Sequence, residues 1–152
     1  MLCLGWICYQ DFKEREVFLF LFVLLGILLS TSFYLHISVL PVFLYSLLLN
    51  LILVAILVLL SYLITSAILK KRFLNHSLGT GDILFFACVA VGFPSMTFII
   101  LFSCALLFSL LLFLALKTYR RMETVPLAGL MSLFFIVVMG YSLFKGASLY
   151  TF

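Results

Sequence analysis

Long runs of apolar residues, separated by short polar connections, dominate this chain. A membrane-spanning helix needs about 20 apolar residues, and the stretches from Val17 to Leu35 and from Val42 to about Ile68 each meet that length, with Pro41 between them. The next stretch, from Ile83 to Leu116, would form a helix of roughly 50 Å, which is too long for one span. The pattern therefore predicts two spanning helices and then a third run that must be broken.

Gly92-Phe93-Pro94-Ser95 supplies that break. Proline cannot continue a helix cleanly, and it disfavours helical geometry in the residue before it. We expect a short helix directly after Asp82 and a full span from about Met96 to Leu116. The last apolar run predicts a span from Pro126 to about Leu143, with proline in the first turn, where its missing N–H costs least.

The first segment, Met1 to Gln10, is apolar but short. As a helix it reaches only about 15 Å, or half a bilayer. It has no basic residues ahead of its apolar part and no small-residue cleavage site, so it does not resemble a signal peptide. Two interpretations stay open: a half-span packed against the other helices, or the end of a longer segment that starts upstream of Met1.

The composition fixes the class of protein. Of the 152 residues, 67% are hydrophobic and 9% are charged, whereas a soluble domain carries about 25% charged residues. A transmembrane barrel would show alternating segments of about ten residues, and these runs do not alternate. We predict an all-α, polytopic membrane helical bundle of about six membrane segments, the first one short, with residues 1–152 as a single membrane-embedded domain.

The net charge of +4 does not indicate nucleic-acid binding, because the basic residues stand between spans. The expected partner is the lipid bilayer.

The basic residues also predict an orientation. Eight of the nine Lys and Arg residues lie in the first, third and fifth connections, and Lys145 is the exception. The second connection, around Ser32 to Leu40, has none, and neither does the turn at Pro94. By the positive-inside rule, the basic connections face the cytoplasm. This orientation places all five acidic residues on the cytoplasmic side: Asp11, Glu14, Glu16, Asp82 and Glu123.

Asp82 is the only acidic residue between Glu16 and Glu123, and it begins a long apolar run. Ionisable groups near the hydrocarbon region are costly and tend to mark functional sites. Asp11 ends the first segment at the same membrane face, so the two carboxylates meet if their helices pack together. Two carboxylates in a small desolvated space acquire different pKa values, so that one acts as a general base on water and the other as an acid. This is the chemistry of aspartic proteolysis.

A structural interpretation of Asp82 stands beside the catalytic one. Thr80 or Asp82 would cap a helix after a glycine turn, because a carboxylate in the first turn is favoured by the helix dipole. Gly79 and Gly81 would then permit a backbone geometry or a close approach that other residues do not.

The other polar residues have simpler interpretations. Asn50, within a span, is interpreted as the donor or acceptor of an interhelical hydrogen bond. The two histidines and four cysteines show no ligand spacing, so we expect no metal and no cofactor. The cysteines are Cys3, Cys8, Cys88 and Cys104.

Three segments carry a family resemblance. Asp11-Phe12-Lys13-Glu14-Arg15-Glu16-Val17 and Gly79-Thr80-Gly81-Asp82 resemble the D-x-[KR]-x-R-x-[IV] and G-x-G-D segments that carry the two catalytic aspartates of type IV prepilin peptidases. Val125-Pro126-Leu127-Ala128-Gly129 is similar to the proline-containing start of that family's last helix. The order of the segments, the two spans between the aspartates and the cytoplasmic placement agree as well, from Asp11 to about Gly140.

The resemblance implies that Asp11 and Asp82 are the catalytic pair and that Gly79, Thr80 and Gly81 belong to the active-site motif. It implies an aspartic endopeptidase in the bacterial cytoplasmic (inner) membrane that cuts the leader peptide of prepilin-like or pseudopilin-like substrates at the cytoplasmic face. The chain has no region with paired C-x-x-C motifs, so it resembles a peptidase-only form without the family's N-methyltransferase region.

The chain also departs from the family pattern. Phe18 stands where members usually have proline, and Leu84 stands where they usually have lysine, two residues after the second aspartate. These departures and the short first segment favour a second hypothesis, a non-catalytic subunit or degenerate homologue that acts as a scaffold in a pilus or secretion assembly. A small transporter is a weaker third hypothesis, because the spans hold few polar groups besides Asn50.

Overall fold

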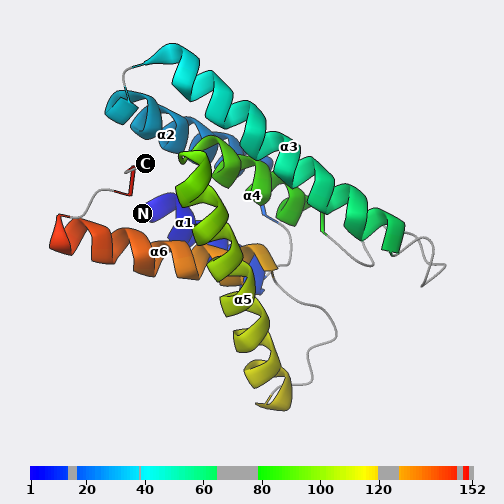
Figure 1. The fold of residues 1–152 in the computed structure, drawn as a ribbon. Helices are drawn as coiled ribbons and strands as arrows, with labels where there is room; N and C mark the ends of the chain where they lie inside the picture. Colours follow the sequence, from blue (N-terminus) through cyan, green and yellow to red (C-terminus); the bar gives the residue numbers. More distant parts are fainter. Residues whose placement is uncertain (14–16, 38, 65–78, 120–126, 147–148, 151–152) are drawn as a thin grey trace.

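The computed structural model describes residues 1–13, 17–37, 39–64, 79–119, 127–146 and 149–150. Within these ranges the chain forms six α-helices and no strand (Figure 1). The helices are α1 (Leu2–Lys13), α2 (Leu19–Ile37), α3 (Leu40–Ile64), α4 (Thr80–Val91), α5 (Ser95–Tyr119) and α6 (Leu127–Lys145). The prediction of an all-α bundle with six segments, the first one short, is confirmed.

Four of these helices are long and apolar enough to cross a membrane: α2, α3, α6 and the Ser95–Leu116 part of α5. Most of their residues are not buried inside the bundle, and their outer faces carry large apolar side chains such as Leu59, Ile100 and Leu111. A surface of this kind suits lipid rather than water. The protein is a multi-pass membrane protein, and α1 and α4, with 12 residues each, are its two short helices.

Two predicted helix boundaries are wrong at the connection between α2 and α3. We expected one span to end at Leu35 and the next to begin at Val42, with a connection around Ser32 to Leu40, but α2 continues to Ile37 and α3 already begins at Leu40. The hydroxyl of Thr31 donates to the carbonyl oxygens of Ile27 and Leu28, at 2.8 and 3.0 Å. Because the hydroxyl is satisfied by its own helix, it does not end that helix. Pro41 lies in the first turn of α3, where proline is tolerated, and the predicted continuation of this span beyond Ile64 lies outside the described residues.

The predicted break between α4 and α5 is confirmed. Helix α4 ends at Val91 and α5 begins at Ser95. Asn50 of α3 is 1% exposed and donates hydrogen bonds from Nδ2 to the carbonyl oxygens of Ala90 and Phe93, at 2.9 and 2.8 Å. The predicted interhelical hydrogen bond of Asn50 is therefore present, and it satisfies carbonyls that the end of α4 leaves without helical partners.

Helix α4 lies at the centre of the bundle and contacts α2, α3, α5 and α6 (Figure 1). It runs parallel to α2, because Gly81 lies against Phe22 at one end and Gly92 lies against Leu29 at the other. It also runs parallel to α6, because Ala128 is bonded to Asp82 and, further along, Phe135 stacks on Phe93. The N-terminal ends of α4 and α6 therefore lie at the same end of the bundle.

Helix α1 packs along α6 in the opposite direction. Gly129, near the start of α6, lies against Asp11, and Gly140 lies against Met1. The C-terminal end of α1 thus meets the N-terminal ends of α4 and α6. The topology brings three helix ends together, and two of them carry the predicted catalytic aspartates.

Candidate functional site

Asp11 and Asp82 converge on the first turn of α6. The backbone N–H of Gly129 donates to Oδ2 of Asp11 at 2.5 Å, and that of Ala128 donates to Oδ1 of Asp82 at 2.8 Å. Since Ala128 and Gly129 are consecutive residues, both carboxylates lie beside the same helical turn. The structure brings the two predicted site residues together although they are distant in sequence.

The N-terminus of α6 explains why two acidic side chains gather there. The first N–H groups of a helix have no partner within the helix, and the aligned peptide dipoles give this end a partial positive charge. A buried helix end therefore needs acceptors, and negatively charged ones are favoured. Asp11 and Asp82 provide these acceptors from two other helices.

Asp82 also caps its own helix. Gly79 occupies the residue before α4, and its N–H donates to Oδ2 of Asp82 at 3.2 Å. The predicted cap position is wrong, because Gly79 is the N-cap residue and Asp82 is the third residue of α4, from which its side chain accepts the N–H of the cap. Thr80 is the exposed first residue of α4. Both oxygens of the Asp82 carboxylate accept backbone hydrogen bonds, one from the start of α4 and one from the start of α6.

The glycines have different roles from those predicted. Gly79 has φ −69° and ψ 146°, an extended geometry that any residue adopts, although a Cβ there would lie 3.3 Å from Oδ2 of Asp82. At Gly81, a Cβ would lie 3.6 Å from Phe22, which is an ordinary contact, so the predicted close approach is wrong there. The close approach occurs at Gly129, where a Cβ would lie 2.9 Å from Oδ2 of Asp11.

Burial is the main influence on the charge of Asp82, which lies outside the four spanning helices. The pKa of Asp82 is raised from its ordinary 3.8 to about 6, and desolvation by burial is the largest cause. The hydrogen bond from Ala128 opposes this shift, the negative charge of Asp11 adds to it, and the hydrogen bond from Gly79 opposes it slightly. The negative charge of Asp11 disfavours ionisation of Asp82, as expected for two carboxylates that share a site.

Two buried polar residues next to the aspartates were not predicted. Gln10, beside Asp11, is 6% exposed, and its Oε1 accepts a long hydrogen bond of 3.4 Å from the N–H of Phe18. Ser132, one turn after the start of α6, donates to the carbonyl oxygen of Gly129 at 2.8 Å. The sequence signal for both is a polar residue inside an apolar segment, which is weak because most such residues in membrane helices serve packing.

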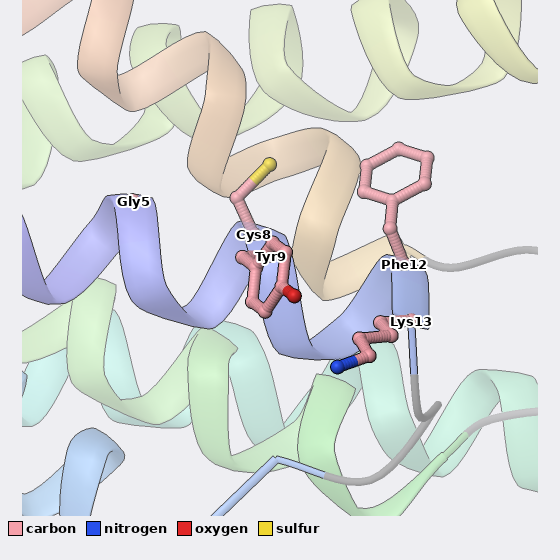
Figure 2. Close-up of a pocket in the computed structure, with 5 residues that line it drawn as sticks. All are labelled: Gly5, Cys8, Tyr9, Phe12 and Lys13. Carbon is pink, nitrogen blue, oxygen red and sulfur yellow. The ribbon is translucent and has the colours of Figure 1, made fainter.

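Two hollows adjoin the aspartates without being lined by them. One, of about 430 Å³, lies on α1 and is lined by Gly5, Cys8, Tyr9, Phe12 and Lys13. Figure 2 shows Cys8 and Phe12 pointing toward α6, while Tyr9 and Lys13 lie side by side, with Lys13 Nζ 5.4 Å from the ring centroid of Tyr9.

A smaller hollow, of about 140 Å³, lies between α3, α4, α5 and α6. It is lined by Phe86, one turn after Asp82, and by Leu127, which precedes Ala128. Its lining is apolar apart from Ser61 of α3. Within the described ranges, no three His, Cys, Asp or Glu side chains are grouped so that they could hold a metal ion.

Leu84, two residues after Asp82, is 37% exposed. Its side chain is apolar and brings no positive charge to the carboxylates. Comparison of the chain with protein-family models, with curated proteins and with solved structures found no match. The features that bear on function are therefore the geometry of the two aspartates and the resemblance of their motifs.

Proposed function

We propose that this protein is a membrane aspartic endopeptidase that cleaves the leader peptide of prepilin-like proteins at the cytoplasmic membrane face. The observation that carries the proposal is the convergence of Asp11 and Asp82 on consecutive N–H groups of α6. The two residues come from segments that resemble the two motifs of type IV prepilin peptidases, and a shared site is what a two-aspartate mechanism requires.

The environments of the two carboxylates suggest their roles. Asp82 is the group that burial and the charge of Asp11 hold protonated up to about pH 6, so it serves as the acid. Asp11 serves as the base: it removes a proton from a water molecule, whose oxygen then attacks the carbonyl carbon of the scissile peptide bond. Asp82 donates its proton to the carbonyl oxygen, which gives a gem-diol intermediate. As the C–N bond breaks, the proton that Asp11 took is passed to the leaving amine, and Asp82 takes back a proton from one hydroxyl of the diol, so that the carboxylic acid product forms and both residues return to their starting states.

The N–H groups of Ala128 and Gly129 hold both carboxylates in place during these steps. Each carboxylate oxygen bonded to the start of α6 is oriented by a rigid helix rather than by a loop. Catalytic groups fixed in this way avoid reorganisation when the reaction occurs.

A second candidate function is a non-catalytic scaffold subunit of a pilus or secretion assembly. It is favoured by the bonding of Asp82, whose two oxygens both accept backbone hydrogen bonds. Such a carboxylate has a complete structural role, because it caps α4 and α6 at once.

Cleavage by the purified, reconstituted protein distinguishes the two functions. The assay uses prepilin-like substrates with a short basic leader ahead of an apolar helix, and it compares wild type with Asp11→Asn, Asp82→Asn and the control Met96→Ala, an exposed position in α5. The peptidase proposal expects cleavage by wild type and the control and none by either aspartate variant, with all four proteins inserted and helical. Full activity in Asp82→Asn contradicts the proposal, and absence of cleavage together with co-purification of an assembly complex supports the scaffold.

A further inference from the structure

Gly129 combines two features at the point where α1 meets α6. Its N–H donates the 2.5 Å hydrogen bond to Oδ2 of Asp11, and it has no side chain where α1 approaches. A Cβ at this position would lie 2.9 Å from Oδ2 of Asp11, 3.1 Å from Cβ of Asp11 and 3.2 Å from Cδ2 of Phe12. All three nearest atoms thus belong to Asp11 or to the residue after it.

We propose that Gly129 is a positioning residue for Asp11: the absence of a side chain lets the carboxylate reach the amide that holds it beside Asp82. This inference rests on the proposed peptidase function and adds to it a residue that neither catalytic motif contains. Real Cβ atoms do not approach other heavy atoms to within 3.0 Å, so any side chain at Gly129 displaces either the carboxylate or the whole C-terminal turn of α1.

The other glycines of α1 and α6 show that this approach is local. A Cβ at Gly140, eleven residues further along α6, would lie 3.6 Å from Met1, which is an ordinary contact, and one at Gly5 would meet nothing within 4 Å. Helices α1 and α6 therefore do not need glycine along their whole contact. They need it where Asp11 bonds to α6.

The nearest neighbour of the missing Cβ also distinguishes positioning from packing. A glycine that serves packing alone faces apolar atoms of the neighbouring helix, as Gly92 faces Cβ of Leu29 at 2.8 Å. Gly129 faces the carboxylate oxygen itself. A substitution there acts first on the proposed base, and the displacement of a reacting group by about 1 Å can lower the rate on the order of a hundredfold.

The first test is kinetic and compares Gly129→Ala with the matched control Gly140→Ala in the same helix. The substrate is a prepilin-like peptide, and kcat and KM are measured separately. We expect kcat of Gly129→Ala to fall on the order of a hundredfold with KM unchanged, because the contact positions the proposed base, while Gly140→Ala keeps both values. An unchanged kcat in Gly129→Ala, in a protein whose wild type cleaves, overturns the inference and leaves the peptidase proposal standing.

The second test needs no activity. Unfolding in detergent is measured for wild type, Gly129→Ala, Asp11→Ala and the double variant, because residues in direct contact show non-additive effects. We expect Gly129→Ala to be destabilising with Asp11 present and much less so in the Asp11→Ala background, where the carboxylate is absent. If Gly129→Ala alone does not fold, recovery of folding in the double variant supports the inference. An equal loss in both backgrounds overturns it, whatever the cleavage assay shows.

Discussion

Asp82 accepts a hydrogen bond from the N–H of Ala128, 46 residues further along the chain, at 2.8 Å. This bond joins the start of α4, the central helix, to the start of α6. Asp11 makes the corresponding bond to the next amide of α6, so the ends of three helices are fixed by two carboxylates. The candidate site is therefore also a structural joint, and changes at it are expected to alter stability as well as chemistry.

The stability of the protein should depend on pH through Asp82. The pKa of Asp82 has its ordinary value of 3.8 in the unfolded chain and rises to about 6 in the folded protein. The folded state therefore binds the proton more tightly than the unfolded state does. The stabilisation from Asp82 is fully present below pH 3.8 and is lost as the pH rises through about 6. The free energy of unfolding changes by at most about 3 kcal/mol over this range. Unfolding in detergent, followed by circular dichroism across this range, measures it.

The matched control for this prediction is Asp82→Asn, which cannot titrate. The difference in unfolding free energy between wild type and this variant should change over the interval from pH 3.8 to about 6 and level off above it. A constant difference across the interval would show that Asp82 does not have a raised pKa.

Gly92→Ala should destabilise the contact between α2 and α4. A Cβ at Gly92 would lie 2.8 Å from Cβ of Leu29, an atom fixed to the backbone that cannot rotate away, so the helices must separate. Overpacking of this kind typically costs about 1–3 kcal/mol. The control is Gly26→Ala in the same interface, where the Cβ would be 3.6 Å from the flexible end of Cys88. Equal unfolding midpoints for the two variants would contradict the prediction.

Asn50→Leu should be destabilising although it makes the core more apolar. Asn50 is the donor to the carbonyl oxygens of Ala90 and Phe93, and leucine leaves these buried acceptors without that partner. An unsatisfied buried acceptor costs about 1–3 kcal/mol. Leu48→Ala, at an exposed position of the same helix, is the control and should change the unfolding free energy less. A stabilised Asn50→Leu protein would show that water or another donor replaces the amide.

The fold was predictable where it depends on length and apolarity. Six segments, a short first segment and the break at Gly92–Ser95 follow from the number of apolar residues needed to cross a bilayer and from the behaviour of proline. The end of α2 was predictable less exactly, because the helix continues two residues past the predicted Leu35. Ser30, Thr31 and Ser32 look like a polar connection in the sequence, but Thr31 bonds to carbonyls of its own helix, and Ser32 lies 2.8 Å from the hydroxyl of Tyr150.

The two acidic residues of the candidate site could be predicted from the sequence, whereas the backbone groups that bind them could not. A carboxylate in an apolar chain is costly, so Asp11 and Asp82 stand out in the sequence. The backbone amides of Ala128 and Gly129 hold these carboxylates in place. Because almost every residue has such an amide, the sequence does not indicate which ones bind a carboxylate. The need for glycine at position 129 depends on how closely α1 approaches α6, which only the packed helices determine.

The proposed mechanism predicts a pH limit for cleavage. If Asp82 is the acid, kcat/KM should fall as the pH rises through about 6, where this group loses its proton, because kcat/KM reports the ionisation of the free enzyme. The fall should approach about tenfold per pH unit on the alkaline side. Measurement of initial cleavage rates at low substrate concentration provides the profile. A profile that stays flat through this range would exclude Asp82 as the acid.

Asp11→Asn should lower the pKa of Asp82, and this prediction does not depend on activity. The negative charge of Asp11 is one of the causes that raise this pKa, and asparagine removes the charge while keeping the size of the side chain. A carbon-13 NMR titration of labelled aspartate carboxyl groups follows Asp82 directly in wild type and variant. The control is Lys13→Gln, since Lys13 is an exposed cation beside Tyr9 and is not among the causes of the shift. An unchanged titration of Asp82 in Asp11→Asn would show that the two carboxylates are not coupled, and a two-aspartate mechanism would then have no electrostatic basis in this protein.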